Sequence, residues 1–463
     1  MNKVMSPLVA LLMVLGALGF VELGSPARAQ ADYSPGTPMD SAWRQYGGLN
    51  GPGRSVGGYV CGLRGGWCYQ GFENGFLYQA PNGHTSWVKS PVYEQWAQRD
   101  LEHGWLGFPL GMFREQDRGW HYQDFEGGEL LQKPDGAWVE SKGGIRSAWA
   151  AEGYQTGPVG YPVDNEVPLP EGGAYQLYEN GRITWDPDIG AYTLYGPILM
   201  SWLNWGADAS WLGLPISANQ EQYRGWRFQD FEQGALLLSP NGQVYESYGP
   251  IREAWAASGW APGPLGYPVS GIAWLDEEAE ASYQLYEYGR IMSYEQDDVG
   301  THAMYGPILA EWSARNYEHG ILGYPTSEVN WQYRGWRYQD FMGGALLLSP
   351  NGQVYESIGD SRMAWERSGW GNGPLGYPTS NVIELSDAAS YQLYETGRIM
   401  TNPAGDTFFM YGKLLDAWVA QDYERGSLGY PTSDVTCDVS GCTQDFEGGT
   451  LVADPAGNVT KRP

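Results

Sequence analysis

Pairs of carboxylates recur along this chain at a spacing that could support glycoside hydrolysis. They are Asp124 with Glu126, Asp230 with Glu232, and Asp445 with Glu447. Residues two apart on a β-strand point to the same face with Cα atoms about 7 Å apart, and glycosidases use two carboxylates. One copy has Met342 in place of the glutamate. A catalytic centre is normally single, so a repeated and incomplete pair predicts a structural or binding role, and no enzyme.

A second group of side chains has the chemistry of a sugar-binding surface. Sugars are bound by aromatic rings that stack on C–H faces and by carboxylate, amide or guanidinium groups that bond to hydroxyls. The candidate ligand-binding residues are Trp120, Trp226, Trp336, Arg224, Arg334, Asp230, Asp340, Gln229, Gln339 and Arg290. The alternative is structural: Trp226 would belong to the core, and Arg227 would pair with Asp230 to brace a hairpin.

Four cysteines form two close pairs near the ends of the chain, Cys61 with Cys68 and Cys437 with Cys442. In an exported protein we expect two local disulfides, each joining the strands of one hairpin. No histidine lies near either pair at ligand spacing, which predicts no metal site. The sequence also predicts no cofactor.

These residues belong to a chain that repeats itself. A tryptophan recurs every 53 residues, with one interval of 57, at Trp43, Trp96, Trp149, Trp202, Trp255, Trp312, Trp365 and Trp418. Eleven residues after the last seven comes the glycine of a Leu-Gly-x-Pro turn or a near copy, whereas the first unit has Arg54 there. Units of this kind bury their apolar faces against their neighbours. Residues 39–463 are therefore predicted to form one array of about eight units.

Each unit is predicted to contain one short helix and two or three short antiparallel strands. Around Trp255, Pro250 suits the first helical turn and Gly259 suits the C-terminal cap. Ile251 and Trp255 stand four apart on one helix face, which predicts that the repeated tryptophans are buried. A Pro-Asn-Gly turn at residues 240–242 indicates a hairpin. The expected fold is a β-rich, pseudo-symmetric propeller-like or ring array, with an open superhelical array as the alternative.

The strand segments alternate in kind along the array. One kind contains Gln229-Asp230-Phe231 or a copy of it, and we call such units QDF units. The other contains Gln284-Leu285-Tyr286 or a copy, and we call these QLY units.

The first residues of the chain predict export. Lys3 precedes an apolar run at residues 8–21, and Ala27-Arg28-Ala29 offers a cleavage site, so residues 1–29 are predicted to be a signal peptide and 30–38 a short linker. A membrane anchor is the alternative, but Glu22 ends the run before the ~20 residues that a membrane span needs. We expect a secreted protein, extracellular or associated with the cell wall, without membrane insertion.

The formal net charge of −27 restricts the partners of this chain. Nucleic acids and anionic lipids bind clustered lysine and arginine, so the acidic surface predicts no nucleic-acid partner. Neutral polymers are compatible with this charge.

The turns Leu106-Gly107-Phe108-Pro109 and Leu212-Gly213-Leu214-Pro215, set within 53-residue units, resemble the LGFP repeat family. The resemblance covers nearly everything from about Asp40 onward. It implies an exported bacterial protein, since these repeats typically hold wall enzymes on polysaccharide such as arabinogalactan. We expect no such enzyme to be attached to these repeats.

The sequence thus predicts a non-enzymatic, exported repeat protein that binds a neutral polysaccharide of the cell wall or envelope. The first alternative is a scaffold that binds a surface protein partner. The second, a cell-wall hydrolase, would need catalytic carboxylates among residues that look structural.

Overall fold

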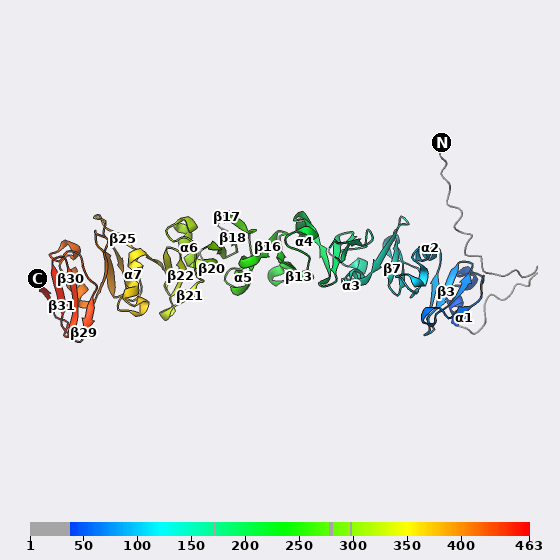
Figure 1. The fold of residues 1–463 in the computed structure, drawn as a ribbon, viewed down its shortest axis with the longest axis horizontal. Helices are drawn as coiled ribbons and strands as arrows, with labels where there is room; N and C mark the ends of the chain where they lie inside the picture. The colour runs from blue at the N-terminus through cyan, green and yellow to red at the C-terminus, as the bar shows by residue number, and fades with distance from the viewer. Residues whose placement is uncertain (1–37, 171, 277–280, 297–298) are drawn as a thin grey trace, which may run out of the picture. The chain divides into compact units, whose positions relative to one another are not determined.

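The computed structural model describes residues 38–170, 172–276, 281–296 and 299–463, and Figure 1 shows short helices and small sheets alternating along them. The predicted signal peptide lies outside these residues. None of the helices in the described ranges is long and apolar enough to cross a membrane. The chain divides into two compact bodies: one extends to Ser147 and includes Pro162–Val167, and the other contains Ala148–Tyr161 and Pro168–Pro463.

Each repeat unit contains a four-stranded antiparallel sheet whose strands are hydrogen-bonded in chain order. The described residues form eight such sheets, which confirms the predicted number of units. Their strands are β1 (Val60–Cys61), β2 (Cys68–Phe72), β3 (Gly75–Gln79) and β4 (Thr85–Val88); β5 (Arg114–Glu115), β6 (His121–Phe125), β7 (Gly128–Gln132) and β8 (Trp138–Lys142); β9 (Val167–Pro168), β10 (Ala174–Tyr178), β11 (Gly181–Asp186) and β12 (Gly190–Tyr195); β13 (Gln220–Glu221), β14 (Arg227–Phe231), β15 (Gly234–Leu238) and β16 (Val244–Tyr248); β17 (Ala273–Asp276), β18 (Ala281–Leu285), β19 (Gly289–Tyr294) and β20 (Gly300–Tyr305); β21 (Asn330–Trp331), β22 (Arg337–Phe341), β23 (Gly344–Leu348) and β24 (Val354–Ile358); β25 (Ile383–Glu384), β26 (Ser390–Leu393), β27 (Gly397–Thr401) and β28 (Thr407–Tyr411); β29 (Thr436–Asp438), β30 (Gly441–Phe446), β31 (Gly449–Ala453) and β32 (Val459–Arg462).

Each sheet therefore has one or two strands more than the two or three expected. The missed strand is the first of each sheet, which in most units is two residues long, as in β13. A pair of residues is too short to show the alternation of apolar and polar side chains by which a strand is recognised. The four-stranded antiparallel sheet is also the unit from which β-propeller blades are built. Whether the eight units close into a ring or coil openly stays a prediction.

One short helix accompanies each sheet, as predicted. The helices are α1 (Pro38–Gln45), α2 (Val92–Ala97), α3 (Gly143–Ala151), α4 (Gly196–Asn204), α5 (Gly249–Ala257), α6 (Gly306–Ala314), α7 (Gly359–Arg367) and α8 (Gly412–Val419). Seven of their tryptophans are buried: Trp96, Trp149, Trp202, Trp255, Trp312, Trp365 and Trp418. Each packs in the hydrophobic core of its unit, so the predicted structural role is confirmed.

The recurrence of glycine eleven residues after each tryptophan has a direct cause. The indole N–H of Trp255 donates a hydrogen bond to the carbonyl oxygen of Gly266 at 3.0 Å, and Trp96 bonds to Gly107 in the same way at 3.1 Å. Gly266 has φ +74°, and a Cβ there would lie 2.4 Å from Glu287 Oε2. The turn therefore needs glycine both for its conformation and for the approach of the carboxylate.

The first unit has this same arrangement, displaced by one residue. The indole N–H of Trp43 donates to the carbonyl of Gly53 at 2.7 Å, and Gly53 has the positive φ of the turn glycine. The amide of Arg54 donates to Glu73 at 2.8 Å. Arg54 thus follows the turn glycine and does not replace it, and the first unit has the same tryptophan–glycine contact as the others.

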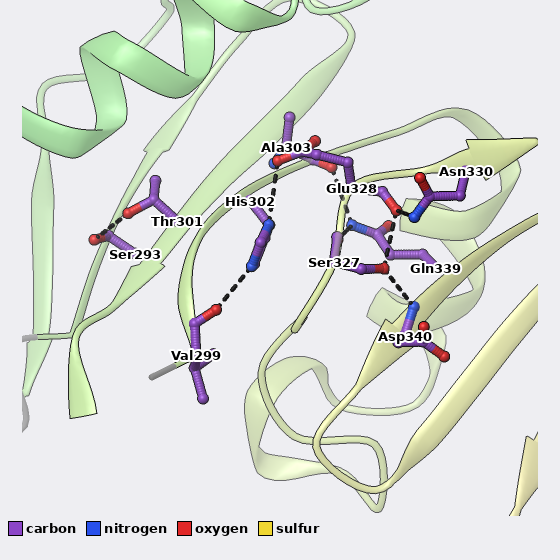
Figure 2. Close-up of polar contacts among 10 residues, drawn as sticks. All are labelled: Ser293, Val299, Thr301, His302, Ala303, Ser327, Glu328, Asn330, Gln339 and Asp340. Atoms are coloured by element: carbon purple, nitrogen blue, oxygen red, sulfur yellow. Dashed lines mark hydrogen bonds and ion pairs between the residues drawn. The ribbon is translucent and has the colours of Figure 1, made fainter. Parts of the chain in front are cut away.

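Successive units are joined by a buried glutamine that belongs to the strand of one unit and reaches the preceding one. Gln339 Nε2 donates to the carbonyl of Ala303 on β20 at 3.1 Å and to that of Ser327 at 2.8 Å (Figure 2). Gln229 bonds to the carbonyls of Thr193 and Ser217 in the same manner. Both were predicted as ligand-binding residues, but they are fully buried and fasten one unit to the next.

A second contact at the junction shown in Figure 2 is charged. The Glu328 carboxylate accepts from the Ala303 amide at 3.3 Å, and its Oε1 lies 3.2 Å from His302 Nδ1. Burial disfavours the charged imidazole, but the hydrogen bonds to Glu328 and to the Val299 carbonyl outweigh it and raise the pKa of His302.

Both predicted disulfides are present. Cys61 and Cys68 face each other across β1 and β2, and Cys437 faces Cys442 across β29 and β30. Each bond joins the first two strands of a terminal sheet, where the first strand is short and has a partner on one side only.

Candidate functional site

The tryptophans predicted to stack on sugars are part of the core. Trp120, Trp226 and Trp336 are each 6% exposed. Trp226 stacks on Tyr267 with ring centroids 4.2 Å apart and an interplanar angle of 4°, and Trp336 stacks on Tyr377 at 4.4 Å and 7°. A ring face that already covers a tyrosine is not free for a sugar. These residues are therefore not the stacking surface, which is a correction to the sequence interpretation.

The predicted arginines also hold units together. Arg224 forms an ion pair with Glu287 and lies 5.4 Å above the ring of Tyr267, while Arg334 pairs with Glu395. Arg290 is buried between Tyr283 at 3.8 Å and Trp312 at 5.4 Å. Arg224 and Arg334 remain partly exposed at a rim, whereas Arg290 is not accessible.

A surface cavity of about 510 Å³ lies beside β14, β15 and the end of α5, all in the second body. Its most exposed ring is Tyr223, at 66%, and Trp260 is 39% exposed. The polar part of the wall is the ion pair between Asp230 and Arg252, with 2.8 Å between Oδ1 and Nη2. Ala235, opposite Asp230 in the sheet, also lines the cavity. The structure thus brings two aromatic rings, a carboxylate and a guanidinium together on one wall.

Trp260 is held firmly in this wall. Its backbone has φ 57°, a left-handed conformation, and its amide donates to the Trp255 carbonyl at 3.0 Å. The Trp260 ring meets the buried Trp255 edge-on, with centroids 4.9 Å apart. Arg252 lies 5.1 Å from the Trp260 ring, which adds a cation–π contact. The exposed ring is therefore positioned before any ligand binds.

A second cavity, of about 470 Å³, adjoins the first. Asp230, Arg252 and Trp260 line both cavities, and the second extends past Ile216, Glu232 and Glu253. The ion pair and the tryptophan therefore stand between two hollows, and a ligand longer than one ring could contact both sides.

The same group recurs in the next QDF unit. Asp340 pairs with Arg362 at 2.8 Å, and Arg362 lies 5.2 Å from the ring of Trp370. Trp370 meets Trp365 edge-on at 5.0 Å, and Tyr333 is 67% exposed. Ligand binding by Asp230 and Asp340 stays a prediction; their ion-pair partner is the helix arginine and not Arg227.

Sequence reasoning missed Trp260, Trp370, Tyr223 and Tyr333. Trp260 and Trp370 follow the core tryptophan by five residues, just beyond helices α5 and α7; the same place after α3 holds Tyr154. This five-residue spacing could have predicted the two tryptophans. Trp226 and Trp336 were predicted instead because their segments are richer in polar residues.

The repeated carboxylates are engaged in structural contacts. Asp230 is paired with Arg252, and Glu232 accepts a hydrogen bond from the Leu214 amide in the Leu-Gly-x-Pro turn at 2.7 Å. Across the described ranges, no group of three or more histidine, cysteine or acidic residues lies close enough to hold a metal ion. The arrangement provides hydrogen bonds and aromatic surface, which are the components of a binding site.

These features define a β-rich repeat protein whose sheets are linked by short helices with buried tryptophans. The LGFP repeat profile matches residues 106–157, 159–210, 212–263, 265–320, 322–373, 375–426 and 428–460. Because these matches cover most of the sequence, the chain belongs to the LGFP repeat family. Such repeats are typical of cell-surface proteins, and the two disulfides fit an extracellular location.

A comparison with curated protein sequences finds no match. Among solved structures, virginiamycin B lyase from Staphylococcus aureus is 11% identical, with 74% of this chain and 93% of that chain covered and a TM-score of 0.11. The TCP10 domain of Danio rerio CPAP is 11% identical, with 53% of this chain and 98% of that chain covered and a TM-score of 0.16. Likeness at these scores supports no conclusion about this chain.

Proposed function

We propose that this chain is an exported, non-enzymatic protein that binds a neutral polysaccharide of the cell wall at the cavities beside Trp260 and at the equivalent residues around Trp370. The observation that carries the proposal is a tryptophan held against a carboxylate–guanidinium pair in two units, with Trp260 exposed and Trp370 half-buried. The tryptophan supplies a flat apolar face for sugar C–H groups, and the ion pair supplies donors and acceptors for hydroxyls. Family membership supports the cell wall as the location.

Two features favour an extended polymer as the ligand. The cavity next to Trp260 continues into a second hollow, so a chain of sugars can pass the ion pair without ending there. Repetition of the site allows one polymer to occupy both copies. Linked weak sites can gain ~10²- to 10⁴-fold in apparent affinity where geometry allows simultaneous contact.

The absence of catalysis is part of the same proposal. Hydrolysis needs one carboxyl group free to donate a proton and a second placed across the scissile bond. Asp230 is held by Arg252, and Glu232 is held by the Leu214 amide. Neither contact leaves the carboxylate available for proton transfer.

The test is retention on insoluble wall polysaccharide, with released reducing ends measured in the same samples. We expect Trp260→Ala and Trp370→Ala to weaken retention by about tenfold each, since 1.4 kcal/mol corresponds to a factor of ten, and the double variant to lose most of it. Trp331→Ala is the matched control because Trp331 is more exposed, at 69%, but lies outside the cavities described. Unchanged retention in the double variant would exclude the proposed site, and release of reducing ends would show an enzyme.

The acidic surface favours one second candidate, a scaffold for a basic protein partner. The two candidates differ in their response to salt. Attraction between exposed charges is screened, with a Debye length of about 3 Å at 1 M salt, whereas stacking on a neutral sugar is not. Retention that persists at 1 M salt supports the polysaccharide, and retention that disappears supports the protein partner.

A further inference from the structure

The residue that faces the aspartate of the QDF motif across the sheet differs in size among the QDF units. It is Glu129 opposite Asp124, Ala235 opposite Asp230, Ala345 opposite Asp340 and Thr450 opposite Asp445. Ala235 lines the 510 Å³ cavity, so the size of this side chain determines how much room remains beside the ion pair.

Glu129 is buried, at 4% exposed, within the first body. Its Oε1 lies 3.3 Å from Arg146 Nε, and Arg146 Nη2 lies 3.1 Å from Asp124 Oδ1. Arg146 corresponds to Arg252, and Asp124 corresponds to Asp230, by their positions in the repeat. One guanidinium therefore contacts two carboxylates in this unit, where the corresponding Arg252 contacts Asp230 alone among the acidic residues described.

In three units, a buried serine on the neighbouring strand lies directly opposite the residue that faces the aspartate. The pairs are Glu129 with Ser141, Ala235 with Ser247, and Ala345 with Ser357. The Oγ atoms of all three serines have no hydrogen-bond partner among the described residues. The serine is therefore common to these units, and the difference between them lies in the residue opposite it, Glu129, Ala235 or Ala345.

We propose that the Glu129 carboxylate occupies the place beside the helix arginine that a sugar hydroxyl takes in the Ala235 and Ala345 units. The inference rests on the proposed function. The unit that contains Glu129 is then a closed site, and the array has two open sites, at Asp230 with Arg252 and at Asp340 with Arg362.

Two observations support this assignment. The carboxylate of Glu129 contacts the arginine that would otherwise be available to a ligand hydroxyl. In addition, burial raises the pKa of Glu129 to about 7 despite the nearby Arg146, so the charged carboxylate is held there at a cost in stability. A costly side chain in one copy of a repeat is better explained by its effect on the site than by the stability of the fold.

The last QDF unit follows a different pattern. Thr450 Oγ1 donates to Asp445 Oδ1 at 2.6 Å, so the aspartate is bonded to a residue of its own sheet. The proposal therefore concerns three units, of which two are open.

The experiment measures the number of binding sites in the full chain by isothermal titration calorimetry. The probe is a soluble neutral oligosaccharide released from the same wall polysaccharide. We expect two sites in the parent, three in Glu129→Ala, and two in Glu129→Gln, which keeps the side-chain volume. The reciprocal variant Ala235→Glu with Ala345→Glu is expected to bind at least tenfold more weakly.

The outcomes separate this inference from the function on which it rests. If Trp260→Ala with Trp370→Ala loses binding but Glu129→Ala still has two sites, the inference is wrong and the proposed function stands. If the double tryptophan variant binds like the parent, the proposed function itself is wrong. Near-ultraviolet circular dichroism checks that each variant is folded; should Ala235→Glu misfold, the site number in Glu129→Ala decides alone.

Discussion

The two kinds of unit use an arginine against an equivalent aromatic ring but supply it from different elements. Beside a QDF sheet, Arg252 comes from the following helix α5, is partly exposed, and lies 5.1 Å from Trp260. In the next QLY unit, Arg290 comes from strand β19, is buried, and lies 5.2 Å from Tyr317. The repeat thus keeps the same scaffold while one kind of unit uses its guanidinium in the core and the other presents it at the surface.

The motif residues explain this difference. Asp230 in the QDF unit holds the helix arginine, whereas Leu285 at the same position cannot. Phe231 in the QDF unit corresponds to Tyr286, whose hydroxyl donates to Gln284 Oε1 at 2.9 Å. The glutamine that joins the units is common to both. Two differences within this three-residue motif therefore change whether a unit holds a surface arginine, while the glutamine contact that joins the units stays the same.

The largest expected effect tests the shared scaffold. Trp255→Ala, after a QDF sheet, and Trp312→Ala, after a QLY sheet, should each lower the free energy of unfolding by about 3 to 5 kcal/mol, because each removes a buried indole. Urea unfolding followed by circular dichroism measures the loss. Clearly unequal losses would show that the two kinds of unit are not equivalent in their cores.

The next prediction separates the two arginines. Arg290→Ala should lower the free energy of unfolding by roughly 3 kcal/mol, because it removes the buried guanidinium that pairs with the 6% exposed Glu318 side chain. Arg252→Ala should cost less than about 1 kcal/mol, since its ion pair is partly exposed, but it should weaken retention on polysaccharide. Thermal unfolding and co-sedimentation of both variants check this. A loss of retention in neither variant would contradict the role given to Arg252.

Glu129 should produce a pH dependence that the alanine units lack. The pKa of Glu129 is raised from 4.5 to about 7 in the folded state, so the folded protein binds this proton more tightly than the unfolded chain does. The contribution of Glu129 to the free energy of unfolding therefore falls as the pH rises from 4.5 through 7. Glu129→Gln should therefore raise the free energy of unfolding by up to about 3 kcal/mol at pH 8 and leave it unchanged at pH 4. Urea unfolding at both pH values measures it. An equal effect at the two pH values would mean that the folded pKa is not raised.

The smallest effect concerns the glutamine that joins units. Gln229 Oε1 has no hydrogen-bond partner among the described residues, whereas Gln284 Oε1 accepts from Tyr286. Phe231→Tyr should supply the missing donor and stabilise the protein by about 1 kcal/mol, and Tyr286→Phe should cost about the same. Differential scanning calorimetry of the two variants measures the opposite shifts. A destabilised Phe231→Tyr would indicate that the hydroxyl does not fit beside Gln229.

The parts of this protein predicted correctly from sequence depend on local spacing. The helix around Trp255 follows from its proline, its glycine and its apolar face, and the pairing of Cys61 with Cys68 follows from their proximity. The two-residue strands could not be predicted, because they exist only through pairing with the next strand. Arg54 misled the interpretation of the first unit because a one-residue displacement is invisible without the hydrogen bond from Trp43.

By itself, the sequence determined the repeat, its helix and its turn, since these depend on residues close together in the chain. Only the tertiary structure decided which aromatic rings are accessible. Trp226 and Trp260 are alike as residues, but Trp226 is covered by Tyr267 from the following unit, whereas Trp260 is partly open to solvent above Trp255. Burial depends on what packs against a side chain from elsewhere in the chain, and for Trp226 that contact comes from the next repeat.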